Sequence, residues 1–170
     1  DKGIMLAHQD ALAYGHSWYK DPERSDVKDV TGDYPAVIGW ELGHLELGHK
    51  YNLDSVYFSD IKKYVQETHR RGGVTTMSWH GDNSVTGNNA WDCAQDYVVK
   101  SVLPGAENHD KFLVWLDHLA AFFLDIKDDN GELIPIVFRL YHEHTGDWFW
   151  WCQKQCTPEE YKEMWKMTVD

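Results

Sequence analysis

Glu143 is the residue whose position most clearly suggests chemistry. It lies between His142 and His144, shortly after the apolar run 134–138, which predicts a strand buried on both faces. Three tryptophans follow it: Trp148, Trp150 and Trp151. A carboxyl group that emerges from a buried strand among aromatic rings is partly desolvated, and desolvation favours the protonated form that can donate a proton near neutral pH. This is the environment that a glycosidase acid needs.

The ordinary explanation of these residues is a solvated loop glutamate next to a tryptophan-rich core. Crowding of polar groups, including Arg139, beside the tryptophans weakens that explanation. A zinc-protease motif, H-E-x-x-H, would require histidine where the sequence has Gly146. We therefore expect no metal here and favour Glu143 as a proton donor.

The charge balance excludes some classes of partner. Lys and Arg total 16 against 28 Asp and Glu, giving a net charge of −12. Such a chain repels phosphate backbones and anionic membranes, so we expect no nucleic-acid or membrane partner. No apolar run approaches the roughly 20 residues of a membrane span. The given residues contain no secretory signal, which is equally compatible with a chain whose start was processed or trimmed.

Tryptophan and cysteine give weaker indications. Nine Trp and nine Tyr in 170 residues suit either a large aromatic core or carbohydrate binding, because indole faces pack against sugar rings. The spacing of Cys93, Cys152 and Cys156 does not match a zinc ribbon. Cys152 and Cys156 are close enough in sequence for a disulfide, and unpaired thiols are at least as compatible with the sequence.

Strand and helix patterns alternate along the chain. Strands are predicted in 4–10, 36–41, 74–80 and 134–138, and helices over 59–71, 110–127 and 158–170, the last opened by a capping box at Thr157. This order implies parallel strands with right-handed crossovers. Polar and aromatic residues cluster at the strand C-terminal ends: His8, Gln9, Asp10, Trp40, Glu41, Trp79, His80, His142 and Glu143. That edge is the catalytic face of a (β/α)8 TIM barrel.

Two further observations bear on the fold class. A flavodoxin-like sheet would usually carry a glycine-rich phosphate turn after its first strand, and none is seen. A full barrel needs about 250 residues, whereas this α/β chain supplies about the first four β/α units. We therefore expect residues 1–170 to form one partial domain, the N-terminal half of a TIM barrel, with two exposed sheet edges and an exposed apolar face.

The ordered motifs resemble glycoside hydrolase family 26, chiefly β-mannanases, along almost the whole chain. The matching segments are His8–Asp10, Tyr14–Gly15 with Trp18, 25–27, 30–37, Gly39–Gly43, Arg71–Gly73, Ser78–His80, Ala90–Asp92, Phe138–Arg139, His142–Glu143 and Thr145–Trp151. The resemblance implies a retaining hydrolase on a TIM barrel that needs no cofactor. Glu143 matches the general acid/base, and His142 and His80 match histidines that contact the sugar in the −1 subsite.

The resemblance also suggests roles for aromatic residues. Trp148 matches an aromatic that lines the site beside the acid/base, while Trp79 and Trp91 lie in matching motifs and are expected near the substrate. Arg139 is either a site residue or a buried structural partner. The family nucleophile is a glutamate after the seventh strand, so it lies beyond Asp170, and neither Glu41 nor Glu46 matches its motif.

The resemblance favours cleavage of β-1,4-mannosidic linkages in a β-mannan-type polysaccharide. The alternatives are a β-1,3-xylanase or β-glucanase of the same family, or a non-catalytic carbohydrate-binding protein. Because polysaccharides do not enter cells, the resemblance further implies a secreted, periplasmic or cell-surface protein. We also expect the intact domain to be a monomer.

Overall fold

The computed structural model describes residues 3–170, which divide into two compact units. Unit 1 comprises the residues up to Glu41, Lys50–Ser78 and Phe123–Arg139. Unit 2 comprises Leu42–His49, Trp79–Phe122 and Leu140–Asp170. Unit 1 contains the main sheet, and unit 2 is built from the three segments that follow strands of that sheet in the sequence.

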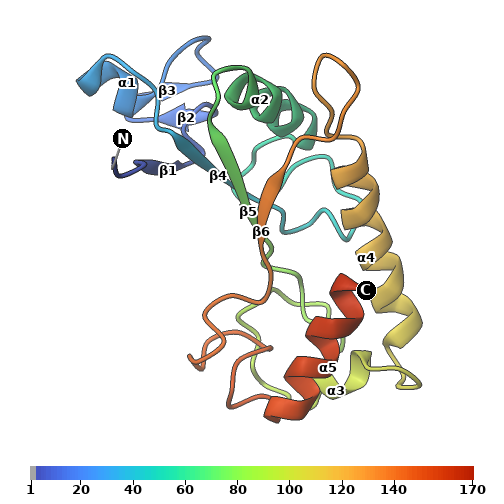
Figure 1. The fold of residues 1–170 in the computed structure, drawn as a ribbon. Coiled ribbons are helices and arrows are strands. Elements are labelled where there is room, and N and C mark those ends of the chain that lie inside the picture. Colours follow the sequence, from blue (N-terminus) through green and yellow to red (C-terminus); the bar gives the residue numbers. More distant parts are fainter. Residues whose placement is uncertain (1–2) are drawn as a thin grey trace. The chain divides into compact units, whose positions relative to one another are not determined.

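The sheet of unit 1 has four parallel strands: β1 (Ala7–Gln9), β4 (Val37–Glu41), β5 (Val74–Ser78) and β6 (Ile136–Arg139). Their order is β1-β4-β5-β6, so each strand lies next to the strand of the same sheet that follows it in the sequence (Figure 1). Helix α2 (Phe58–Arg70) contacts β5 and buries Ile61 and Val65. It ends before Gly72, whose φ of +75° suits glycine. The predicted parallel order is confirmed.

The two outer strands differ from the prediction. β6 begins two residues later than expected, and its residues alternate in burial, with Val137 56% exposed. Alternate side chains of β6 therefore lie on an uncovered face, so the predicted double burial of the run 134–138 is wrong for the described chain. At the opposite edge, Ile4, Met5 and Leu6 are exposed and precede β1. The expected exposure of two edges and of apolar side chains is confirmed.

Three short elements lack the periodicity that would have predicted them. A two-stranded hairpin joins β2 (Tyr14–Gly15) to β3 (Trp18–Tyr19), and helix α1 (Asp26–Thr31) follows. The indole of Trp18 donates to Asp26 at 2.6 Å, which ties the hairpin to α1. Helix α3 (Val98–Val102) is the third such element.

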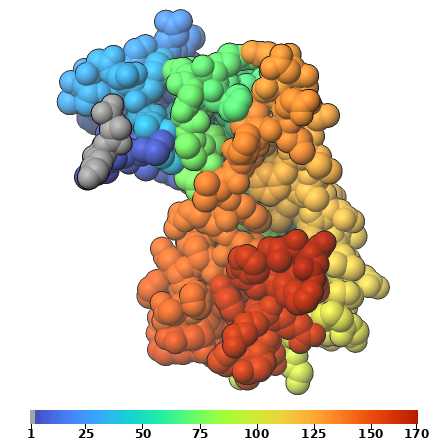
Figure 2. All heavy atoms as spheres, in the orientation of Figure 1, coloured from blue at the N-terminus to red at the C-terminus, as the bar shows by residue number. Residues whose placement is uncertain are grey.

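Unit 2 is built around helices and aromatic rings. Helix α4 (His109–Leu124) is shorter at its C-terminus than expected, while α5 (Pro158–Val169) begins as predicted. Thr157 and Glu160 form the predicted capping box at the start of α5. The core contains Phe112, Trp115, Tyr141, Trp150 and Trp151. Residues 140–170, orange to red, form a closely packed region of this unit (Figure 2).

In the described part of the chain, the helices lack the length and apolar character needed to cross a bilayer.

Candidate active site

The loop after β6 holds Glu143 in an uncommon backbone conformation. Glu143 has a φ of +58° and Tyr141 a φ of +43°, in the left-handed region that is unfavourable for residues other than glycine. The loop is held by hydrogen bonds on both sides of Glu143. The Trp151 indole donates to the backbone carbonyl of His142 at 2.9 Å, and the backbone N–H of Gln153 donates to the backbone carbonyl of His144 at 2.8 Å. The surrounding structure therefore stabilises a conformation that costs energy locally.

The Glu143 carboxylate accepts a hydrogen bond from Trp148. The indole Nε1 lies 2.8 Å from Oε2 of Glu143. Gly146 makes room for this contact, because a Cβ there would lie 2.7 Å from the Trp148 ring. Glu143 is nevertheless exposed and Trp148 is 46% exposed. The expectation that neighbouring aromatics partly desolvate this carboxyl is wrong for the described chain, since Trp150 and Trp151 turn into the core.

The two predicted histidines meet directly in unit 2. Nε2 of His142 lies 3.2 Å from Nε2 of His80, and the rings are perpendicular with centroids 4.6 Å apart. In such a pair one imidazole donates its Nε2–H and the other accepts, so the two tautomers are coupled. The His80 ring also stacks on Trp91 at 5.0 Å with an interplanar angle of 8°. Trp91 is 50% exposed, which leaves part of this aromatic assembly open to solvent.

Phe149 contacts both histidines of the candidate site, and the sequence did not single it out. Its buried ring lies 5.0 Å from His80 and 5.5 Å from His142, and it stacks on Trp151 at 4.5 Å. One ring thus contacts both imidazoles. Its place in the aromatic run 148–151 was the available signal, but a run does not tell which of its rings faces the histidines.

Trp79 occupies a different place from the one expected. It is 1% exposed and packs against Phe112 and Tyr141 at centroid distances of 5.9 and 6.1 Å. A ring so enclosed cannot stack on a sugar without rearrangement of the core around it. Its indole Nε1 instead donates to Oε2 of Glu46 at 3.0 Å. In the described chain this ring is therefore not open to a sugar, contrary to the substrate contact expected for it.

Unit 1 carries two acids at strand ends. Asp10, buried just after β1, accepts a hydrogen bond from the Tyr14 hydroxyl at 2.7 Å, and burial raises the pKa of Asp10 to about 6. Glu41, at the end of β4, accepts from the Ser78 hydroxyl at 2.7 Å. Arg139, at the end of β6, is exposed, so the suggestion of a buried structural partner is wrong for the described chain.

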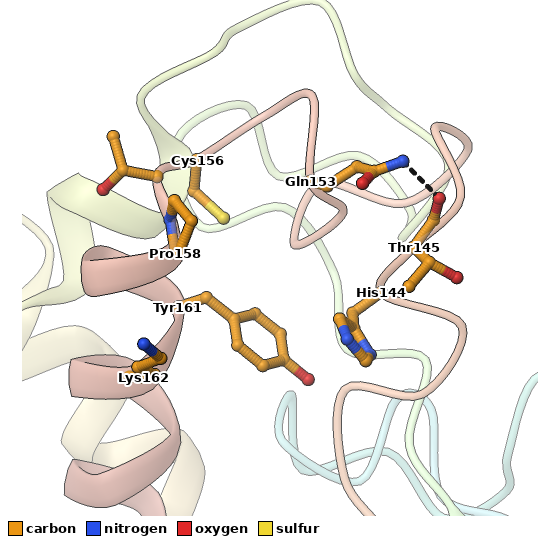
Figure 3. A pocket seen from close by; sticks show the side chains of 8 residues that line it. His144, Thr145, Gln153, Cys156, Pro158, Tyr161 and Lys162 are labelled. Carbon is orange, nitrogen blue, oxygen red and sulfur yellow. Dashed lines mark hydrogen bonds between the residues drawn. The ribbon is translucent and has the colours of Figure 1, made fainter.

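A separate cavity of about 350 Å³ lies between the loop after Glu143 and the start of α5. The His144 ring stacks on Tyr161 at its side, with centroids 5.0 Å apart, and Gln153 bonds the carbonyl of Thr145 (Figure 3). Glu143, the histidine pair and the exposed tryptophans do not line it. Cys156 also lines this cavity, and burial raises the pKa of its thiol to about 11. Cys93, Cys152 and Cys156 form no disulfide with one another in the described chain.

The arrangement in unit 2 suits acid–base chemistry on a neutral, hydroxylated ligand. It offers one exposed carboxylate, a coupled imidazole pair and two partly exposed indoles. Among residues 3–170, no three His, Cys, Asp or Glu side chains are grouped so that they could hold a metal ion. A retaining glycosidase needs two carboxyl groups about 5–5.5 Å apart. The described residues supply Glu143 as a candidate for one of them.

Comparison with known proteins identifies the family of the chain. The family model for glycosyl hydrolase family 26 matches residues 1–170. A mannan endo-1,4-β-mannosidase of Bifidobacterium adolescentis is 35% identical over 151 residues, which cover 86% of this chain and 15% of that protein. One from Bacillus subtilis is 27% identical, over 81% of this chain and 38% of that protein. The chain thus spans well under half the length of these curated relatives.

Solved structures give the fold. A family 26 β-mannanase from Bacteroides ovatus superposes with a TM-score of 0.97 at 49% identity, covering 98% of this chain and 48% of that one. An endo-β-1,4-mannanase from Cellulomonas fimi gives 0.87 at 36% identity, covering 99% and 38%. The four parallel strands are thus part of a TIM barrel of which the chain spans about half. The chain belongs to glycosyl hydrolase family 26.

Proposed function

We propose that the complete protein hydrolyses β-1,4-mannosidic linkages with retention of configuration, and that Glu143 is its general acid/base. The observation that carries the proposal is the assembly within unit 2 of an exposed carboxylate, two imidazoles in contact and two partly exposed indoles. The names of the relatives, which are mannan endo-1,4-β-mannosidases, support mannan over xylan or glucan.

The Trp148 indole gives the two oxygens of Glu143 different environments. Oε2 accepts the indole N–H at 2.8 Å, which orients the carboxyl group. Oε1 is then the oxygen to face the glycosidic bond. In the first step protonated Glu143 donates its proton to the leaving oxygen while a second carboxylate of the complete protein, outside the described residues, attacks the anomeric carbon. In the second step ionised Glu143 removes a proton from water, which releases the sugar.

The histidines and exposed indoles bind the substrate in this proposal. His80 and His142 hydrogen-bond hydroxyls of the sugar next to the scissile bond, and their mutual contact limits each to one orientation. The ring faces of Trp91 and Trp148 pack against the C–H faces of sugar rings. Because a polysaccharide does not enter cells, we also propose that the protein acts outside the cytoplasm.

The proposal is tested by measuring reducing-sugar release from β-mannan, β-1,3-xylan and mixed-linkage β-glucan by the full-length protein and its Glu143→Ala variant. We expect mannan to be the preferred substrate and the variant to lose about 10²–10⁴-fold in kcat, as for other general acids. Glu163→Ala, an exposed change on α5, is the matched control and should retain full activity. Mannan cleavage at wild-type rate by the Glu143 variant would contradict the assignment, and binding without cleavage by the wild type would indicate a carbohydrate-binding protein.

A further inference from the structure

Glu46 is a buried carboxyl group that the chemistry proposed above does not use. It is 1% exposed and lies in the segment Leu42–His49 that follows β4. Its Oε2 accepts the Trp79 indole N–H at 3.0 Å, and its Oε1 accepts the backbone N–H of Asp82 at 2.9 Å. The two donors flank His80 in the sequence. One carboxylate therefore holds the chain on both sides of a proposed substrate-binding histidine.

Two further contacts restrict the same short segment. The Trp150 indole donates to the carbonyl of Gly81 at 2.9 Å. A Cβ on Gly81 would lie 2.5 Å from the Trp79 ring, so the backbone next to His80 runs directly against that indole. Displacement of Trp79 would therefore move the backbone that carries His80.

Glu46 is itself held by α4. Nδ1 of His118 lies 2.7 Å from the backbone carbonyl of Glu46. The turn around it is closed by backbone bonds from Leu45 to Leu42 and from Gly48 to Leu45. A carboxylate carried on a backbone held in this way can transmit a fixed position to its hydrogen-bond donors.

We propose that Glu46 is a positioning residue that fixes the orientation of His80, and through it the contact of His80 with His142. The inference rests on the proposed function for its effect on turnover, but the orientation itself can be measured without turnover. A shift in either donor of Glu46 would change the 3.2 Å contact between the two imidazoles and the stacking of His80 on Trp91.

The charge state of Glu46 bears on this role. Burial raises its pKa to about 7, and the neighbouring Asp82 carboxyl adds to the rise. His44, His49 and Lys111 face Asp82, whose own pKa is raised by burial. Ionised Glu46 offers both oxygens as acceptors, whereas protonation turns one of them into a hydroxyl. We therefore expect the fixed orientation of His80 to loosen as the pH falls through neutrality, a dependence that Glu46→Gln removes.

A double-mutant cycle in the full-length protein tests the proposal. Glu46→Gln keeps the shape of the side chain but presents an NH₂ group to one of the two donors. We expect it to lower kcat/KM on mannan about tenfold when His80 is present and less than about twofold in the His80→Ala background, because an effect exerted through His80 disappears without it. Glu163→Gln on the exposed face of α5 is the matched control. An equal loss in both backgrounds would overturn the proposal.

A readout that needs no turnover separates this inference from the proposed function. NMR of the His80 imidazole and of the Trp79 indole N–H should show both signals shifted in Glu46→Gln and unchanged in Glu163→Gln. Trp79→Phe, which removes one donor and keeps a ring, should shift the His80 signals in the same direction. An unchanged His80 signal in both Glu46→Gln and Trp79→Phe would sink the positioning role even if mannan is cleaved. Absence of mannan cleavage by the wild type would instead sink the proposed function alone.

Discussion

A hydrogen bond from a tryptophan indole to a glutamate carboxylate occurs twice in unit 2, once buried and once exposed. Trp79 donates its indole N–H to Glu46 at 3.0 Å, and Trp148 donates its indole N–H to Glu143 at 2.8 Å. The first pair is enclosed, with both side chains 1% exposed, whereas the second lies open to solvent. Chemically equivalent contacts can therefore serve different purposes, because burial decides whether a carboxylate supports the structure or remains accessible to a substrate.

The largest expected effect concerns the buried carboxylate and is a pH dependence of stability that comes from Glu46. The folded-state pKa of Glu46, about 7, is above its ordinary value of 4.5. The folded state therefore holds the proton more tightly, and the charged group destabilises it increasingly as pH rises from about 4.5 to about 7, by roughly 3 kcal/mol in total. Glu46→Gln abolishes this loss.

The measurement is the free energy of unfolding in urea at pH 4.5 and pH 8 for the wild type and Glu46→Gln. Between pH 4.5 and pH 8, the free energy of unfolding of the wild type should fall relative to that of Glu46→Gln by most of these roughly 3 kcal/mol. Asp10, with its pKa near 6, titrates in both proteins and cancels from the difference. Parallel pH curves would contradict the burial assigned to Glu46.

Replacing each indole donor should change the free energy of unfolding by different amounts in the buried and the exposed pair. Trp79→Phe leaves the buried Glu46 carboxylate short of one donor and should lower the free energy of unfolding by about 2 kcal/mol. Trp148→Phe leaves an exposed carboxylate that water can solvate, so stability should change by less than about 0.5 kcal/mol. Urea unfolding of both variants at pH 8 measures the contrast, and equal losses of stability would erase the distinction drawn here.

A smaller effect is expected away from both pairs. Thr157→Ala removes the side chain that accepts the amide of Glu160 in the capping box of α5, which should cost about 1 kcal/mol. Turnover of mannan should stay at the wild-type value, because neither carboxylate is touched. Thermal unfolding measures the expected loss of stability, and the mannan assay measures the expected unchanged turnover. A loss of turnover would mean that α5 also supports the site.

The sequence predicted those features that depend on local pattern. The apolar runs located β4 and β5 to within a few residues, and the Thr157–Glu160 spacing located the start of α5. The pairing of His80 with His142 is a contact over 62 positions, and the parallel strand order made it plausible because both follow neighbouring strands.

The sequence could not predict which way a ring points. Trp79 and Trp91 both lie in motifs of the segment that follows β5, yet one is enclosed and the other half exposed. The direction depends on partners distant in the chain, such as Phe112 for Trp79. For the same reason Glu46 was noted only as an acid that does not match the nucleophile. Its two donors lie 33 and 36 positions away, beyond the reach of any local pattern.

The left-handed backbone of Glu143 has an evolutionary consequence. At a φ of +58° a glutamate costs about 1–2 kcal/mol more than a glycine would, so selection for stability alone favours its loss. A lineage that no longer needs the carboxyl group gains stability by replacing it with glycine, and return to glutamate is then opposed by the same cost. With Glu143 as the proposed acid/base, retention of the acid trades stability against activity, and its loss acts as a one-way step.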